Sequence, residues 1–95
     1  MRLSVSEAAR DHMARIHDHI AGDNPYAARR VLADLRRAMR ILKGQPHIGH
    51  AGQLTGTREW PVRGRPYIIV YRVDEAAGEV VVVGLYHAAR LRPPD

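Results

Sequence analysis

The chain has 95 residues, no cysteine, and 15 Lys and Arg against 10 Asp and Glu, which gives a formal net charge of +5. This length predicts one domain over residues 1–95, with a shallow groove or an exposed patch as its site rather than a deep cavity. Without cysteine, disulfides and thiolate zinc sites are excluded.

The charge and the hydropathy pattern indicate where the chain works and what it binds. Lys43 is the only lysine, so the basic residues are almost all arginines, which suit carboxylates and phosphates. The positive charge predicts an anionic partner, either a nucleic acid or an acidic protein. No stretch is apolar enough to be a signal peptide or to span a bilayer. We therefore expect a cytoplasmic protein with no membrane partner.

A first amphipathic helix is predicted to begin near residue 6 or 7. Ser4 and Glu7 have the spacing of a capping box, and Ser6 is a competing N-cap. Gly22 is expected to end this helix. At 100° per residue, one narrow apolar stripe contains Ala9, Met13, Ile16 and Ile20. Leu3 and Val5, just before the helix, alternate with polar residues as in a short strand.

A second helix is predicted from Asn24-Pro25, an N-cap followed by a proline at the first helical position, to Gly44. Its apolar face consists of Ala27, Ala28, Leu32, Leu35, Ala38, Met39 and Leu42. The opposite side carries Arg29, Arg36 and Arg40, which we interpret as a solvated face. The short turn between the two helices predicts an antiparallel helical hairpin.

After a glycine-rich connection over residues 44–56, the apolar pattern changes to the period of strands. Three strands are predicted, over residues 57–63, 67–73 and 79–87. Consecutive hairpins give an antiparallel meander, and Pro61 places the first of these strands at an edge or at a bulge. The expected fold class is α+β, with an N-terminal helical hairpin packed on a small antiparallel β-sheet.

The apolar runs at 68–70 and 80–85 place hydrophobic residues on both faces of this sheet. Two helices can cover only one of those faces. The other face either closes over a small second core or waits for a binding partner.

The chain resembles the ParE/RelE superfamily of bacterial type II toxins over nearly its whole length. The resemblance is carried by the order and spacing of Asn24-Pro25, Pro46 and Gly49, Gly56-Thr57-Arg58-Glu59, the string from Pro66 to Val73, and His87-Ala88-Ala89-Arg90. It implies a toxin that is neutralised by a cognate antitoxin. We expect that antitoxin to be an acidic, partly disordered chain that folds as it binds, laying an apolar helix or strand on this domain.

Members of the superfamily differ in their target. RelE-like members cut messenger RNA on the ribosome, whereas ParE-like members poison DNA gyrase without nuclease chemistry. RelE-like nucleases commonly carry an arginine directly after the tyrosine that corresponds to Tyr67, and here that position is Ile68. The resemblance therefore favours a gyrase inhibitor, with the ribosome-dependent endonuclease as the alternative.

A ribonuclease of this kind needs a base, an acid and cations near the reacting phosphate. The residues that match these roles by type, for the nuclease alternative only, are His87, Tyr86 and Arg65. For target binding, the resemblance indicates Arg58, Arg65, Tyr67, Tyr71, His87 and Arg90. We expect these residues on one side of the sheet and its loops, at a margin exposed to a binding partner. Arg58 and Glu59 have a second interpretation, as an ion pair that holds the sheet edge.

The histidines do not predict a metal site. His17 and His19 point about 200° apart on a helix and cannot chelate one ion together. His47 and His50 lie in the glycine-rich connection without a convincing third ligand. Because the chain also has no phosphate-binding glycine motif, we expect no cofactor.

Overall fold

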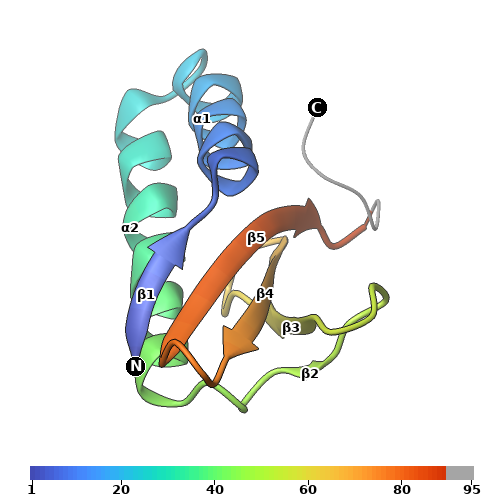
Figure 1. Cartoon of the computed structure of the whole chain (residues 1–95). Coiled ribbons are helices and arrows are strands. Elements are labelled where there is room, and N and C mark those ends of the chain that lie inside the picture. The colour runs from blue at the N-terminus through green and yellow to red at the C-terminus, as the bar shows by residue number, and fades with distance from the viewer. Residues whose placement is uncertain (90–95) are drawn as a thin grey trace.

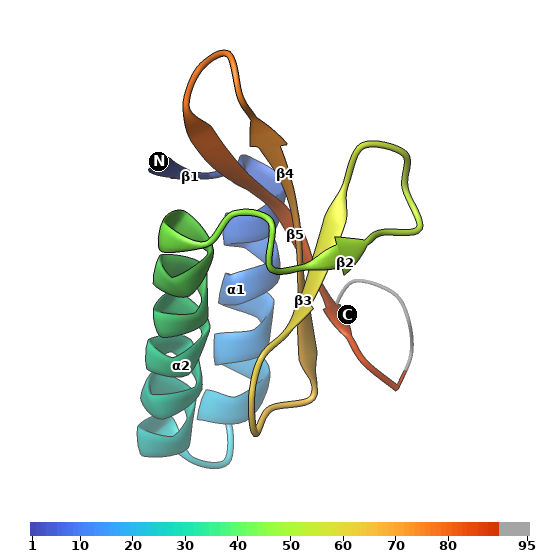
Figure 2. The same ribbon diagram turned by 90° about the horizontal axis from the view of Figure 1, so that it is seen from below.

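The computed structural model describes residues 1–89 and places two helices against one side of a five-stranded sheet (Figure 1). The elements are β1 (Arg2–Val5), α1 (Glu7–Ala21), α2 (Pro25–Gly44), β2 (His50–Ala51), β3 (Arg58–Pro61), β4 (Tyr67–Asp74) and β5 (Glu79–His87). The strand order across the sheet is β1-β5-β4-β3-β2. Figure 2 views the sheet nearly along its edge, with both helices on the same side.

The helices begin where the capping residues predicted. The Ser6 hydroxyl accepts a hydrogen bond from the backbone N–H of Ala9 at 3.1 Å, so Ser6 and not Ser4 is the N-cap of α1. The Asn24 side chain accepts from the Ala27 N–H at 3.1 Å and caps α2. Each cap satisfies a backbone donor that the first turn of a helix leaves without a partner.

The predicted meander is confirmed, but the sheet is mixed rather than wholly antiparallel. Strands β3, β4 and β5 pair antiparallel in sequence. Strand β1 lies parallel to β5, with Val5 opposite Val82. The alternation of Leu3 and Val5 correctly indicates a strand, but alternation contains no information about which strand it pairs with. The predicted connection also contains the short strand β2, which pairs with β3.

Pro61 lies at an open edge, as its missing N–H predicts. The Val62 N–H donates to the Tyr67 carbonyl at 2.9 Å. The backbone N–H and C=O groups of the even-numbered residues in this segment therefore point toward β4. Pro61 therefore turns its nitrogen away from β4. Strand β2 pairs only with Arg58 and Glu59 and does not reach the proline. A proline at this point prevents a further strand from extending the ladder.

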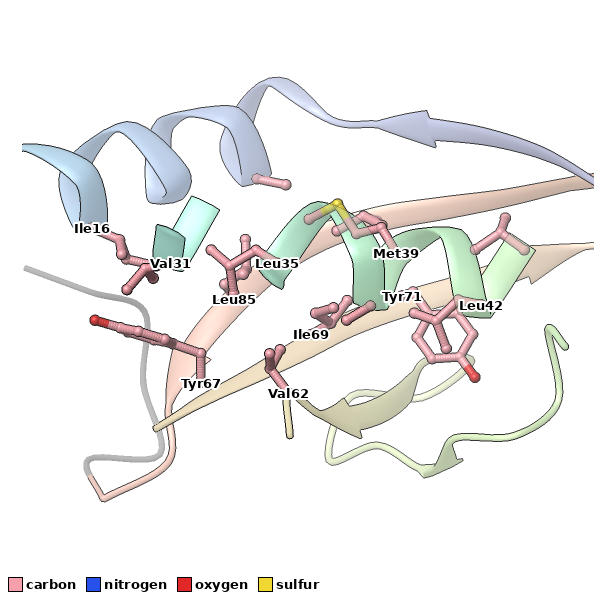
Figure 3. Close-up of a cluster of buried hydrophobic side chains, with 14 residues drawn as sticks. Ile16, Val31, Leu35, Met39, Leu42, Val62, Tyr67, Ile69, Tyr71 and Leu85 are labelled. Carbon is pink, nitrogen blue, oxygen red and sulfur yellow. The ribbon is translucent and has the colours of Figure 1, made fainter. Parts of the chain in front are cut away.

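The hydrophobic core lies between the helices and the sheet (Figure 3). The stripe predicted for α1 is confirmed, with Ala9 and Ile16 buried and Met13 and Ile20 packed beside them. The face of α2 is confirmed too, with the addition of Val31. The sheet contributes Val62, Tyr67, Ile69, Tyr71, Val80, Val82 and Leu85.

The sheet face away from the helices is partly closed. Val70 and Val81 are buried but do not belong to the core cluster, because they alternate with residues that face the helices. Glu59 lies opposite Val70 and is buried as well, whereas Ile68 and Tyr86 are half-buried. Of the two expected alternatives, the burial of Val70 and Val81 supports a small second core on this face rather than an open groove.

His12 on α1 replaces a missing strand at the edge of β5. Strand β1 stops pairing at Val82, and farther along the Leu85 N–H donates to Nδ1 of His12 at 3.1 Å. Gly84 leaves room for this contact, since a Cβ there would lie 3.2 Å from the imidazole ring. The imidazole can accept this hydrogen bond only when Nδ1 is unprotonated.

We expect His12 to make stability depend on pH. Burial, more than the charge of Arg15, lowers the pKa of His12, and Asp11 opposes the shift. The unfolded chain, with a histidine pKa of about 6.5, then binds this proton more readily than the folded chain. The stability that His12 contributes should therefore be full above that value and be lost as the pH falls below it. Urea unfolding from pH 5 to pH 8 measures the effect, with His12→Gln as a control that cannot titrate. Equal pH slopes for both proteins would contradict it.

Candidate functional site

The residues proposed for RNA cleavage do not meet at one point. His87 lies opposite Tyr67 on the helix side of the sheet, and their rings make an edge-to-face contact at 5.7 Å. Nδ1 of His87 is buried without a hydrogen-bond partner among residues 1–89. Tyr86 precedes His87 on β5 and lies opposite Ile68, so its side chain is on the other face of the sheet.

Arg65 is held by an acidic residue of α2. Its Nε lies 2.9 Å from Oδ2 of Asp34, and the other carboxylate oxygen of Asp34 contacts Arg37 at 3.2 Å. Both partners of the Arg65 pair are half-buried, so the pair ties the turn between β3 and β4 to the helix. Arg65 therefore lies on the helix side, away from the face that carries Tyr86.

The expectation that Tyr67 and Tyr71 lie on an exposed margin is wrong. Tyr67 is 8 % exposed and Tyr71 is 0 % exposed, because both alternate with Arg72 and Ile68 and so face the helices. The Tyr71 hydroxyl donates to the Pro46 carbonyl at 2.8 Å and accepts from the Gly49 N–H at 2.9 Å. Tyr71 is thus an anchor for the connection that follows α2.

Burial raises the pKa of the Tyr71 hydroxyl above its ordinary value. The hydrogen bond from Gly49 and the charge of Arg58 oppose this shift without reversing it. The hydroxyl is therefore neutral at physiological pH, and it keeps the proton that it donates to Pro46.

Arg58 and Glu59 hold the same connection instead of pairing with each other. Arg58 donates to the carbonyl of Gly49 at 2.8 Å and to that of His47 at 3.3 Å. The buried Glu59 carboxylate accepts from the Gln53 N–H at 3.1 Å. As neighbours on β3, Arg58 and Glu59 point to opposite faces, which explains why the predicted ion pair does not form.

The connection between α2 and β3 is more ordered than its glycine content suggested. At its tip, the Gly52 N–H donates to the Thr57 carbonyl at 2.9 Å, and the Thr57 hydroxyl donates to the Leu54 carbonyl at 2.6 Å. Gly56 has a φ of +81°, a conformation that favours glycine. Gly49 has no room for a side chain beside the Tyr71 hydroxyl. The positions of Gly49, Gly52 and Gly56 were the feature of the sequence that indicated an ordered connection.

A cationic groove lies along the helical hairpin and β1. It has a volume of about 480 Å³, an apolar lining and an arginine rim, formed by Leu3, Val5, Arg10, Met13, Arg36, Met39 and Arg40. The sequence pattern of α2 predicts only a solvated face for Arg36 and Arg40. The groove could not be predicted because its lining comes from three elements that are adjacent only in the folded chain. Arg29, assigned to the same face, instead stacks on the ring of Tyr26 at 4.7 Å.

The two histidines of the connection, His47 and His50, do not come together. His47 pairs with Glu75 at 2.9 Å and His50 lies 3.7 Å from Glu59, each in a different contact. Within the described part of the chain, no three acidic or histidine side chains are grouped to hold a metal ion. Over the same residues, neither helix combines the length and apolarity that crossing a membrane requires. Arg90 lies outside the described residues.

The fold is similar to that of two chains whose structures were solved from toxin–antitoxin systems. The structure superimposes with a TM-score of 0.81 on a chain of the chromosomal ParDE system from P. aeruginosa, at 19 % identity over 92 % of this chain and 95 % of that chain. It superimposes with a TM-score of 0.62 on a chain of the intact E. coli RelBE toxin–antitoxin complex, at 15 % identity over 88 % and 92 % of the two chains. At these identities the likeness shows the fold alone.

The sequence shows the family. Residues 3–92 match the family model described as ParE toxin of type II toxin-antitoxin system, parDE, and the chain belongs to this family. It is also 35 % identical over 92 residues to a Sinorhizobium fredii protein named "Putative toxin Y4kP", a match that covers 97 % of this chain and 93 % of that protein. The chain is therefore a toxin of the type II toxin–antitoxin class.

Proposed function

We propose that this toxin binds DNA gyrase and blocks its catalytic cycle, so that replication stops. The observation that carries the proposal is the separation of the residues that RNA cleavage would need. His87 and Tyr86 lie on opposite faces of β5, and Arg65 is paired with Asp34. General acid–base catalysis requires an acid and a base within reach of the same phosphate. A toxin that acts by binding has no such requirement.

The position after Tyr67 supports the same proposal. Ile68 is neutral and half-buried, and it lies between Pro61 and Tyr86 on the sheet face away from the helices. A cation on this face would stabilise the developing charge of a cleaved phosphate. An isoleucine supplies none of that stabilisation.

The cognate antitoxin, in this proposal, occupies the groove rimmed by Arg10, Arg36 and Arg40. The apolar lining of the groove, which includes Met13 and Met39, suits the apolar face of an amphipathic helix. The arginines at the rim suit carboxylates that flank such a face, because the guanidinium group binds carboxylates in a bidentate geometry. The expected acidic antitoxin matches both features.

Expression of the chain in a bacterium, followed by analysis of messenger RNA and chromosomal DNA, tests the proposal. Filamentous cells with intact transcripts and arrested replication are the expected result. Rapid cleavage of translated messages would instead support the ribosome-dependent endonuclease and overturn gyrase inhibition.

Toxicity should survive the loss of both nuclease candidates on β5, because His87, which the resemblance also indicated for target binding, packs against Tyr67 on the helix side of the sheet. We expect the double variant His87→Gln, Tyr86→Phe to arrest growth at a dose within about twofold of the wild type, as for substitutions outside a functional contact. Both replacements are close in size to the original side chains, but His87→Gln removes the ring contact with Tyr67, so folding has to be checked. Growth is measured against the quantified amount of toxin, and circular dichroism confirms folding. Complete loss of toxicity in a folded variant would contradict the proposal.

A further inference from the structure

The tip of the connection between α2 and β3 projects from the body of the domain. Figures 1 and 2 both show the segment after β2 reaching away from the sheet and the helices. Leu54, within this tip, is 57 % exposed, and Ile48, at its base, is 37 % exposed. A single exposed leucine is ordinary on a protein surface. Leu54 differs from such a residue in the way that the backbone around it is held.

The backbone that carries Leu54 is held on both sides. Its carbonyl accepts from the N–H of Thr57 at 3.1 Å and from the Thr57 hydroxyl, and the Gly52 N–H closes the loop onto the Thr57 carbonyl. Ordering a loop on binding costs free energy, and a loop that is already ordered avoids that cost. The tip is thus built to present a leucine in one fixed position.

The base of the connection is fixed by buried groups of the sheet. Tyr71 binds Pro46 and Gly49, while Arg58 binds the carbonyl of Gly49. On the other side, the buried Glu59 binds the backbone of Gln53. The polar atoms of these side chains form hydrogen bonds to the backbone of the connection itself. We regard them as positioning residues for the tip, not as residues that contact the target.

The tip has the chemistry of a protein-binding element. Residues 45–57 contain no Asp, Glu, Lys or Arg, although 26 % of the whole chain is charged. Binding to a nucleic acid backbone depends on cations that neutralise phosphates. This segment has no Lys or Arg, and its two histidines, His47 and His50, lie against Glu75 and Glu59. An uncharged segment with an exposed leucine fits an apolar pocket on a protein.

The tip is also separate from the groove assigned to the antitoxin. The groove includes Leu3 and Val5 of β1, which is one edge strand of the sheet. The tip follows β2, which is the opposite edge strand. The groove and the tip therefore lie at opposite edges of the sheet and are two separate surfaces.

We propose that Leu54 and its tip are the element by which this toxin grips its protein target, with the leucine entering an apolar pocket on that protein. The proposal rests on the proposed function, since it takes gyrase as the target. It deepens that function by assigning the contact to a surface that the antitoxin does not cover.

The test compares purified Leu54→Ser with the wild type in three measurements: inhibition of gyrase supercoiling, growth arrest on titrated expression, and affinity for the antitoxin. We expect the serine variant to need about tenfold more protein, or more, for half-maximal inhibition and growth arrest, as for the loss of an interface anchor. Its antitoxin affinity and its melting temperature should be unchanged, because Leu54 lies outside both the groove and the core.

Two controls make the result specific. Leu54→Met keeps an apolar side chain and should retain full potency. Tyr26→Ser removes the 72 % exposed ring at the start of α2, an even more exposed position on another element, and should also retain full potency. Full potency of Leu54→Ser overturns the proposal, and so does a parallel loss of antitoxin binding. If the wild type leaves gyrase unaffected, the proposed function fails by itself, and the dependence of growth arrest on Leu54 still decides whether the tip grips the target.

Discussion

Reversing the charge of Arg36 and Arg40 together should weaken antitoxin binding by about a hundredfold or more, since hydrogen bonds between charged groups contribute about 1.5–3 kcal/mol each. Both arginines rim the groove on the helical hairpin and are exposed in the free toxin. In the double variant Arg36→Glu, Arg40→Glu, attraction to an acidic partner becomes repulsion at two points. Calorimetric titration of the antitoxin into each toxin measures the change.

The matched control for this prediction is Arg29→Glu, Arg30→Glu. It makes the same change in net charge on the same helix, at exposed positions outside the groove. A general electrostatic effect would weaken both variants equally and would fade with added salt. The groove assignment requires a much larger loss for the Arg36 and Arg40 pair. Equal losses for the two pairs would remove the groove from the antitoxin interface.

Substituting Gly49 should release the connection between α2 and β3 from the sheet. A Cβ at Gly49 would lie 2.5 Å from the Tyr71 hydroxyl oxygen and 2.9 Å from the Glu59 carbonyl oxygen, so the connection has to move. That movement breaks the hydrogen bonds of Tyr71 and Arg58 to Gly49. We expect Gly49→Ala to lower the free energy of unfolding by about 2–4 kcal/mol, from overpacking together with lost buried hydrogen bonds.

Two further variants, Tyr71→Phe and Gly44→Ala, are compared with Gly49→Ala. Tyr71→Phe removes only the hydroxyl and should cost about 1–3 kcal/mol, because the Pro46 carbonyl and the Gly49 N–H lose their partner. Gly44→Ala adds the same methyl group where no atom lies within 4 Å, and it should leave stability equal or slightly higher. Urea unfolding measures all three. A Gly49→Ala protein as stable as Gly44→Ala would show that the connection is not fixed by Tyr71.

The helices were predictable because their signals are local. Ser6 and Asn24 cap the two helices through atoms three residues away, and the turn at Gly22 lies within the same stretch of sequence. The antiparallel pairing of β3, β4 and β5 follows from short turns, which leave neighbouring strands no other arrangement. Pro61 predicted an edge because a missing N–H has the same consequence wherever the strand lies.

The features that sequence analysis missed depend on contacts between distant segments. The parallel partner of β1 is the last strand, and nothing near Leu3 indicates it. The burial of Tyr67 and Tyr71 was accessible in principle, since both share the period of Ile69, but their conspicuous chemistry suggested a surface role. The cationic groove required Arg10 and Arg36 to be placed side by side by the hairpin.

Four arginines of this chain form two pairs that composition cannot distinguish. Arg58 and Arg65 are half-buried and use their planar head groups to hold the connection and the β3–β4 turn. Arg36 and Arg40 are exposed at the groove. In the proposed function, the first pair fixes the shape of the surface that meets the target, and the second pair binds the antitoxin.

Gyrase inhibition without RNA cleavage is most directly measured by a DNA supercoiling assay with purified gyrase and the toxin freed from its antitoxin. The proposed function predicts that supercoiling stops as the toxin is added, that antitoxin restores it, and that ribosome-bound messenger RNA in a parallel reaction stays intact. Supercoiling at its full rate beside cleaved messenger RNA would contradict it.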